Sequence, residues 1–355
     1  MGKVLIAMSG GVDSSVAAKL LCDEGCECIG CTMKLYDNCD AGLPRGRTCC
    51  SLDDVEDARS VAFSLGMRYY VFNFKDDFRE KVIKKFASGY LRGQTPNPCI
   101  DCNRYMKFDK LLERAKLLGC DKLATGHYAR IEFDGEKYRL KKALDKSKDQ
   151  SYVLYMLTQE QLAHTLFPLG SLHKTDTRAI ADAADLSSAR KPDSQDICFV
   201  PDGDYAAAIE RLTGEKAPCG DFIDASGKIL GTHRGITHYT VGQHRGLGLS
   251  LPERRYVCGI DAEIGTVTLG GSDELYSSTA EVRDFNWISG EAPSEPIRCT
   301  AKIRYRQPEQ PATAIARSDG SVTLHFDAPQ RAVTPGQAAV LYDGNTVLGG
   351  GEIVR

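Results

Sequence analysis

The first half of the chain alternates short apolar runs with segments that repeat apolar residues at helical spacing. Residues 3–7 and 69–74 form apolar runs, and 26–33 alternates with a period of two, all of which are typical of strands. Helical spacing is found in 16–21 and 53–65. This strand–helix alternation predicts an α/β fold with a doubly wound parallel sheet.

From about residue 213 the pattern changes to short alternating segments that Gly and Asp separate. The segments 221–224, 257–260 and 265–269 predict a small β-rich central domain, and those at 300–306, 321–326, 338–341 and 347–353 predict a C-terminal antiparallel β-barrel. We therefore expect three domains, at 1–205, 206–275 and 276–355.

Composition narrows the class of protein. The chain has 355 residues, 42% of them hydrophobic, and a net charge of −3, which gives no global sign of nucleic-acid binding. Between residues 75 and 142, however, 17 Lys and Arg face 10 Asp and Glu, a local excess of seven positive charges that suits a phosphate backbone or a solvated helix face. No apolar run approaches the ~20 residues of a membrane span, and the N-terminus lacks a signal pattern. We expect a cytoplasmic protein without a membrane partner, in which 14 cysteines do not form a disulfide framework.

A glycine-rich turn directly follows the first strand and opens the first helix. Its residues are Ala7, Met8, Ser9, Gly10, Gly11, Val12, Asp13 and Ser14. Glycines let main-chain N–H groups approach an anion, the helix directs its positive end to the same place, and Asp13 is a candidate Mg²⁺ ligand. The common phosphate loop requires a lysine that is absent here. Ser-Gly-Gly-x-Asp-Ser instead resembles the pyrophosphate loop (PP-loop) of the ATP pyrophosphatase superfamily, whose members adenylate an oxygen and release pyrophosphate.

Other candidate binding residues lie at the ends of strands, at the edge where ligands bind in parallel sheets. Met33 ends the second strand, and Gly126 and His127 follow the strand 122–125. A single histidine such as His127 is more often structural than functional. The polar turn 146–151 offers Lys148 and Gln150 as phosphate contacts.

Two cysteine-containing segments are candidates for reactive chemistry. Asn97 and Pro98 precede Cys99 and Cys102, a Cys-x-x-Cys pair that we expect at the start of a helix over 109–118, where a nearby positive charge favours thiolates. Cys198 lies between two apolar residues but follows a polar run, so it fits a buried strand residue and an exposed reactive thiol equally well. Cys31, Cys39, Cys49 and Cys50 lack the paired spacing of a typical zinc site.

These motifs, in this order, resemble the bacterial tRNA-specific 2-thiouridylases over nearly the whole chain. The resemblance implies that ATP adenylates O2 of the wobble uridine of tRNA and that sulfur then displaces AMP to give 2-thiouridine. It implies that residues 7–14, Met33 and Gly126 hold ATP, and that Asn97, Pro98 and Cys99 frame a flipped uridine. It assigns the tRNA contacts to His127, Lys148, Asp149, Gln150, Tyr305, Arg306 and Gln337.

The resemblance also implies a route for sulfur. Cys198 would receive a persulfide from a cysteine desulfurase or a sulfur-relay protein, and Cys102 would be the partner nucleophile that forms a transient disulfide. Many members of the family carry an aspartate where this chain has Cys99. Cys99, Cys102 and Cys198 are therefore also candidates to hold a [4Fe–4S] cluster with one open iron. Both sulfur routes remain open at the level of sequence.

Two other functions compete with a tRNA sulfurtransferase. Another PP-loop ligase would explain the glycine-rich turn but not the cysteines, and a non-catalytic metal- or RNA-binding module would explain the cysteines but not an intact PP-loop. Pyrophosphate release that depends on unmodified tRNA distinguishes the three.

Overall fold

The computed structural model describes residues 2–36, 52–192, 197–200 and 202–354. The expectations for Cys39, Cys49 and Cys50 and for the polar run at 193–196 fall outside these residues. Within them, no helix is long and apolar enough to cross a membrane.

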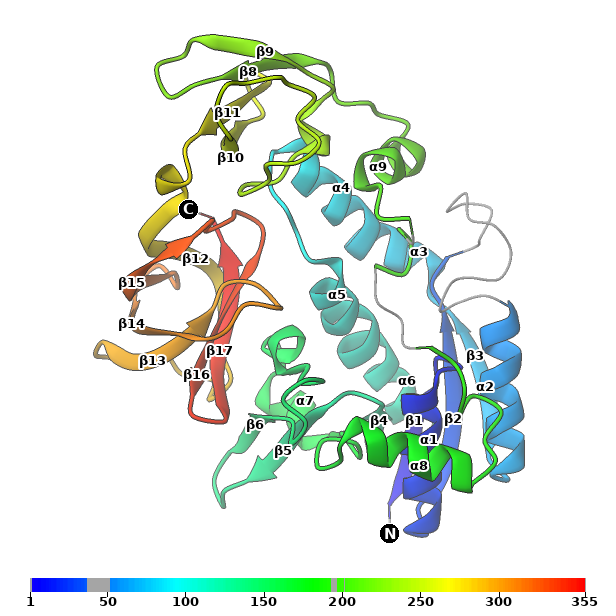
Figure 1. Ribbon diagram of the computed structural model, residues 1–355. Coiled ribbons are helices and arrows are strands. Elements are labelled where there is room, and N and C mark those ends of the chain that lie inside the picture. Colours follow the sequence, from blue (N-terminus) through cyan, green and yellow to red (C-terminus); the bar gives the residue numbers. More distant parts are fainter. Residues whose placement is uncertain (1, 37–51, 193–196, 201, 355) are drawn as a thin grey trace.

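A five-stranded parallel sheet forms the centre of the N-terminal domain (Figure 1). Its order is β3 (Arg68–Asn73), β2 (Glu27–Lys34), β1 (Lys3–Ala7), β4 (Lys122–Thr125) and β7 (Thr165–Leu166). The apolar core residues of β1 divide between two clusters, with Leu5 facing one and Val4 and Ile6 facing the other.

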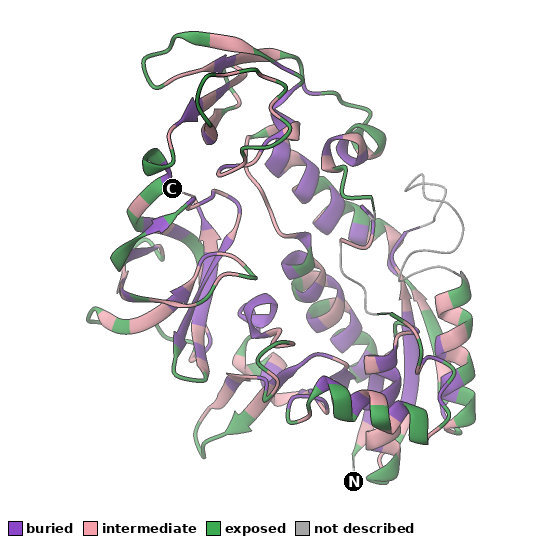
Figure 2. Cartoon of the chain, in the orientation of Figure 1, coloured by how far each residue is buried: buried purple, intermediate pink, exposed green. Residues whose placement is uncertain are grey.

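Helices cover both faces of this sheet, which confirms the predicted doubly wound architecture. One face carries α1 (Val12–Asp23), α2 (Leu52–Ser64) and α8 (Lys174–Ala183). The other carries a helical stretch built from α3 (Lys75–Phe78), η1 (Arg79–Ile83), α4 (Lys84–Leu91), α5 (Pro98–Asp101), η2 (Cys102–Leu111) and α6 (Leu112–Leu117). Figure 2 shows that the buried sides of these helices face the sheet.

The helix that carries the Cys-x-x-Cys pair begins earlier than the expected position 109. It starts at Pro98, where the Asn97 side chain accepts a hydrogen bond from the Cys99 N–H at 3.1 Å. Asn at the N-cap followed by Pro at the first position is a strong start signal. The cysteines therefore lie inside the first two helical turns, with Cys102 at the beginning of a π-helical segment.

The middle of the chain folds into a small four-stranded sheet, which agrees with the expected β-rich class and adds the strand at 229–233 to the three that were predicted. After α9 (Tyr205–Thr213), the strands are β8 (Gly220–Ile223), β9 (Ile229–His233), β10 (Tyr256–Asp261) and β11 (Thr266–Gly270). Phe222, Val257, Val267 and Leu269 fill its core. A short helical turn, η4 (Ile236–His238), follows β9.

The C-terminal region is a closed six-stranded antiparallel barrel, which confirms the predicted class. A short turn, η5 (Asp273–Leu275), leads into it, and its strands are β12 (Tyr276–Trp287), β13 (Ile297–Lys302), β14 (Gln310–Ala316), β15 (Val322–Arg331), β16 (Ala338–Asp343) and β17 (Thr346–Ile353), with β12 pairing to β17 to close the ring. β12 and β14 were not predicted from the sequence. β13 ends at Lys302 and not at the expected residue 306, since Tyr305 and Arg306 lie in the turn after it.

The N-terminal domain contributes a hairpin to the barrel sheet. β5 (Ala129–Phe133) and β6 (Tyr138–Lys142) extend from β17, where Lys141 is paired with Thr346. The Lys142 ammonium bonds to the Gly344 carbonyl at 2.7 Å. Two short helices, η3 (Ser151–Leu154) and α7 (Gln159–Ala163), pack beside this hairpin. The N-terminal domain and the barrel are therefore joined by main-chain strand pairing as well as by side-chain hydrogen bonds.

Candidate functional site

The glycine-rich turn lies at the centre of the sheet's carboxyl edge. Ala7, the last residue of β1, is in register with Cys31 on one side and Thr125 on the other. The Met8 N–H donates to the Cys31 carbonyl at 2.8 Å, and the Thr32 hydroxyl donates to the Met8 carbonyl at 2.6 Å. Pairing with β2 and β4 thus fixes the residues at which the chain leaves β1 and begins the turn.

Backbone requirements explain the first glycine and the serines of the turn. Gly10 has φ +75°, and a Cβ there would lie 2.4 Å from the Asp54 carbonyl oxygen, so only glycine fits. The Ser14 hydroxyl accepts from the Ser9 N–H and donates to the Gly11 carbonyl, both at 3.1 Å. Gly11 begins α1 without a side-chain cap, which leaves the positive end of the helix directed at the turn.

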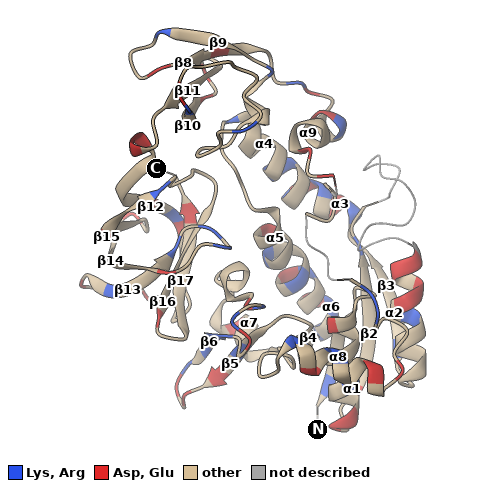
Figure 3. Ribbon diagram, viewed as in Figure 1, with Lys and Arg blue, Asp and Glu red and all other residues tan. Residues whose placement is uncertain are grey.

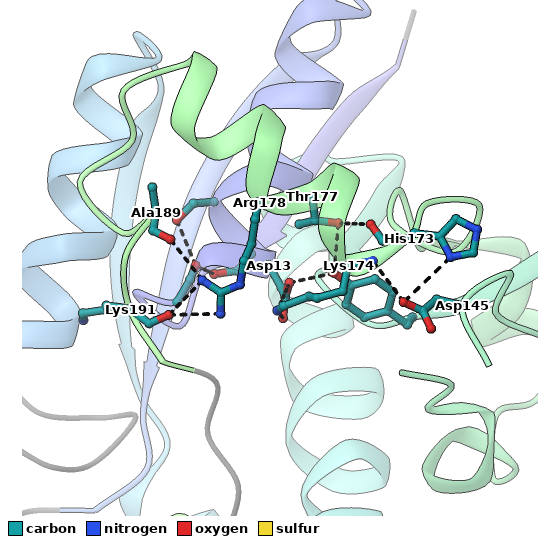
Figure 4. Close-up of polar contacts among 12 residues, drawn as sticks. Asp13, Asp145, His173, Lys174, Thr177, Arg178, Ala189 and Lys191 are labelled. Atoms are coloured by element: carbon teal, nitrogen blue, oxygen red, sulfur yellow. Dashed lines mark hydrogen bonds and ion pairs between the residues drawn. The ribbon is translucent and has the colours of Figure 1, made fainter. Parts of the chain in front are cut away.

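Asp13 is held by two residues from other parts of the fold (Figure 4). The Lys174 ammonium, from the first turn of α8, lies 2.7 and 2.8 Å from its two carboxylate oxygens, and the Tyr128 hydroxyl donates to it at 2.8 Å. The Lys174 side chain is only 11% exposed. The expected Mg²⁺ ligand is therefore an ion-pair partner in this structure, and its charge is balanced by the protein itself.

The two strand-end residues predicted to bind nucleotide flank the turn. Gly126 packs directly against it, since a Cβ at this position would lie 2.8 Å from Asp13 C and Ser14 N. Met33 is half-buried at the end of β2, on the other side of β1. The structure therefore brings residues 7–14, Met33 and Gly126 to one edge of the sheet.

A second set of ion pairs ties the segment before Cys198 to this edge. The Lys191 ammonium pairs with Asp54 at 2.8 Å and also with Asp57, both on α2. The Arg178 guanidinium donates to the Ala189 and Lys191 carbonyls at 3.2 and 3.4 Å (Figure 4). Because Gly10 packs against the Asp54 backbone, α2 contacts both the turn and the chain that leads to Cys198.

The two cysteines of the Cys-x-x-Cys pair differ in their surroundings. Cys99 is exposed on α5, and Cys102 is half-buried against the core of the sheet. From the barrel, Tyr305 approaches this helix. Burial, the Asp149 charge and Cys99 together raise the pKa of its hydroxyl. Figure 3 shows Lys and Arg positions along α4, along the helix that continues from α5 into η2, and in the barrel segment beside them.

Cys198 lies in a turn rather than in a strand. The Val200 N–H donates to the Ile197 carbonyl at 2.8 Å, and the Cys198 side chain is half-buried against the same core as Cys102. Among the residues that the structure describes, no three His, Cys, Asp or Glu side chains are arranged to hold a metal ion. In this structure Cys99, Cys102 and Cys198 are therefore not arranged to ligate an iron–sulfur cluster together.

Several residues expected to contact tRNA make hydrogen bonds within the protein. His127 is 7% exposed, and its ring nitrogens lie 2.7 Å from the Thr125 hydroxyl and 3.4 Å from the Lys107 ammonium. Burial, and secondly Lys107, lower its pKa well below 6.5, so the ring is neutral. His127 is therefore buried in this structure, and its contact with tRNA stays a prediction.

The remaining expected tRNA contacts divide between the interior and the surface. The side chains of Asp149 and Gln150 accept hydrogen bonds from the Ala143 and Tyr128 N–H groups, each at 2.9 Å. Gln337 donates to the Thr95 carbonyl at 2.5 Å, which fixes the segment before α5 on the barrel. Lys148 is half-buried, and Tyr305 and Arg306 are exposed.

Family models cover most of the chain. The model described as "tRNA methyl transferase HUP domain" matches residues 2–202, "tRNA methyl transferase PRC-barrel domain" matches 208–271, and "Aminomethyltransferase beta-barrel domain" matches 277–353.

Curated relatives match along the full length. A protein of Acetivibrio thermocellus named "tRNA-specific 2-thiouridylase MnmA" is 52% identical, with 99% of each chain covered. A protein of Clostridioides difficile with the same name is 47% identical, covering 99% of this chain and 97% of its own. The chain belongs to the tRNA-specific 2-thiouridylase MnmA family. Among solved structures, NMN synthetase of Francisella tularensis is similar at a TM-score of 0.35 and 17% identity, over 61% of this chain and 78% of that one.

Sequence reasoning missed two residues of this MnmA-family site, Lys174 and Asp54. Lys174 is 161 positions from Asp13, so no local motif joins them. One signal was present, because a lysine in the first turn of a helix opposes the helix dipole and requires a compensating anion. The acidic first turn of α2 gives no comparable signal, since acidic residues are common there.

Proposed function

We propose that this protein is an ATP-dependent tRNA sulfurtransferase that converts the wobble uridine of tRNA, position 34, to 2-thiouridine. The observation that carries the proposal is 52% identity over 99% of both chains with a protein named for this activity. Two features support it independently, namely a PP-loop at the carboxyl edge of the sheet and two cysteines packed on one core nearby.

The first step activates an oxygen that cannot leave by itself. Uridine O2 attacks the α-phosphorus of ATP, the bond to the β-phosphate oxygen breaks, and pyrophosphate leaves. Backbone N–H groups of residues 9–14 and the positive end of α1 stabilise the phosphates. Both carboxylate oxygens of Asp13 are engaged by Lys174, so we expect Mg²⁺ to enter bound to the phosphates of ATP.

The second step replaces the activated oxygen by sulfur. The terminal sulfur of a Cys198 persulfide attacks C2 of the uridine, and AMP leaves with the former O2. The Cys102 thiolate then attacks Sγ of Cys198, the S–S bond to the transferred sulfur breaks, and its electron pair stays on the 2-thiouridine. A Cys102–Cys198 disulfide results, and a dithiol reductant restores both thiols. A cysteine desulfurase or a sulfur-relay protein supplies the persulfide.

The exposed surface around Cys99 is the proposed place for the target base. Asn97, Pro98 and Cys99 begin α5, and Tyr305 lies across from them on the barrel. A base must leave the anticodon stack to expose O2, and an aromatic ring provides a stacking platform for it. Arg306 and the basic helices provide contacts for phosphates.

Two assays on unmodified tRNA transcript test this function. Pyrophosphate release is measured with and without tRNA, and 2-thiouridine is measured in nuclease digests after addition of ATP and a persulfide donor. We expect tRNA-dependent release, which Cys198→Ser retains while losing thiouridine. Cys219→Ser, a change at an exposed cysteine of the middle domain, is the control and should retain both.

Other results would assign the protein elsewhere. Pyrophosphate release stimulated by amino acids instead of tRNA would indicate a PP-loop ligase, and no release would indicate an RNA-binding module. The cluster alternative is tested by iron and sulfide analysis of anaerobically prepared protein. Stoichiometric iron that disappears in Cys99→Ala together with activity would replace the persulfide route.

A further inference from the structure

Cys198 sits on a turn that is held at three points. The first is the turn's own hydrogen bond from the Val200 N–H to the Ile197 carbonyl. The second is the Phe199 ring, which is 1% exposed and makes edge-on contacts with Phe78 and Phe86 at centroid distances of 5.8 and 5.4 Å. These two contacts fix the residue after Cys198 in the core.

The third point acts on Cys198 itself. The Tyr36 hydroxyl donates a hydrogen bond to the Cys198 carbonyl at 2.8 Å. Tyr36 is 4% exposed, and its ring lies 6.0 Å from that of Phe78, in the same aromatic cluster that holds Phe199. A hydroxyl–carbonyl bond of this length, donated by a buried tyrosine, restricts the peptide plane and thereby the direction of the side chain.

Tyr36 also connects the sulfur side of the site to the nucleotide side. It follows β2 by two residues, and Met33, near the PP-loop, lies on the same strand. Tyr36 and Cys198 are 162 positions apart in sequence. The end of β2 therefore carries Met33, a candidate ATP contact, and leads directly to the tyrosine that holds the Cys198 carbonyl.

We propose that Tyr36 is a positioning residue for Cys198, holding its sulfur in line with the activated uridine during sulfur transfer. The proposal rests on the proposed function and adds a residue to it. Reacting groups must be held to about 0.5 Å, and a turn does not achieve this without supporting contacts. Tyr36 acts only through the Cys198 main chain and takes part in no bond-making step.

The test is Tyr36→Phe, which removes the hydroxyl and keeps the ring. Three rates are measured: tRNA-dependent pyrophosphate release, single-turnover sulfur transfer from persulfide-loaded enzyme, and alkylation of Cys198 by iodoacetamide followed by mass spectrometry. We expect pyrophosphate release within twofold of wild type and sulfur transfer at least fivefold slower. Alkylation should become faster, because a loosened turn exposes the half-buried thiol.

Tyr152→Phe is the matched control. The Tyr152 hydroxyl is buried and donates to the Ala338 carbonyl at 2.8 Å, so its removal deletes an equivalent bond elsewhere. It should change neither sulfur transfer nor Cys198 alkylation by more than twofold. A similar loss in both variants would assign the effect of Tyr36 to general stability.

The outcomes separate this proposal from the function on which it rests. Wild-type transfer in Tyr36→Phe, unchanged alkylation, or parallel loss of pyrophosphate release and transfer would overturn the positioning role. Absence of tRNA-dependent pyrophosphate release in the wild type would instead overturn the proposed function. The alkylation rates require neither ATP nor tRNA, so they report on the turn in either case.

Discussion

Removing the positive charge that balances Asp13 should weaken the use of ATP. In Lys174→Met, the Asp13 carboxylate keeps the hydrogen bond from Tyr128 but loses the ammonium at 2.7 and 2.8 Å. The uncompensated negative charge then faces the triphosphate from within the PP-loop. We expect this repulsion to appear in kcat/KM for ATP.

The size of the effect follows from the burial of the pair. Two unit charges about 4 Å apart repel each other by about 1 kcal/mol in water and by about 4 kcal/mol at the effective dielectric constant of a partly buried site. The Lys174 side chain is 11% exposed and that of Asp13 is 32% exposed, so this pair lies between the two limits. A loss of about 2 kcal/mol corresponds to roughly a 30-fold decrease in kcat/KM.

The assay is tRNA-dependent pyrophosphate release over a range of ATP concentrations. Lys116→Met is the control, since it removes an ion pair with Glu160 in which the two side chains are 50% and 69% exposed, and it should change kcat/KM less than twofold. The double variant Asp13→Asn/Lys174→Met should lose less than the sum of the two single variants, because neither charge is left alone. A kcat/KM for Lys174→Met within twofold of wild type would refute the reasoning.

Three further predictions use other features of the structure. Gly10→Ala should raise KM for ATP at least tenfold, because its Cβ would lie 2.4 Å from the Asp54 carbonyl oxygen. Gly119 has a similar φ of +68° and open space around it, so Gly119→Ala should only lower the free energy of unfolding, by about 1 kcal/mol. The folded-state pKa of His127 lies below its ordinary 6.5, so on acidification the unfolded state binds a proton before the folded state does. The contribution of the neutral His127 to the free energy of unfolding is therefore full above pH 6.5 and is lost as the pH falls from 6.5 towards the folded-state pKa. Urea unfolding at pH 7 and pH 5 should therefore show a smaller pH-dependent loss in His127→Gln than in wild type, and an equal loss would contradict the assignment. Arg306→Gln should weaken tRNA binding and reduce the slope of log K against log salt by about 0.7 to 0.9, whereas an unchanged slope would exclude a phosphate contact.

The sequence predicted which residues meet at the carboxyl edge of the sheet, because their meeting depends on local patterns. Strand–helix alternation predicts a parallel sheet, and the carboxyl ends of its strands share one edge. Met33 and Gly126 therefore fall beside residues 7–14 once the β2-β1-β4 order is formed. The start of the cysteine-bearing helix was predicted too late, although Asn97 as N-cap and Pro98 at the first position are a local start signal.

The contacts that orient the site could not be predicted, because they join residues far apart in sequence. Lys174 meets Asp13 across 161 positions, and Tyr36 meets Cys198 across 162. No local motif identifies either partner: Lys174 at the start of a helix indicates only that some anion lies nearby, and a tyrosine after a strand is ordinary. The burial of His127 is of the same kind, because its packing against Phe108 and Phe167 joins separate parts of the chain.

The hairpin that the N-terminal domain lends to the barrel has a consequence for synthesis on the ribosome. Lys142 meets the Gly344 carbonyl only after 202 further positions have been translated. At about 5–20 residues per second, β6 waits roughly 10–40 s with its outer edge unpaired. An unpaired strand edge is a template for pairing with another chain. Lys141 and Lys142 on β6 therefore serve the nascent chain as well as the finished protein, because their charges discourage such pairing until β17 emerges.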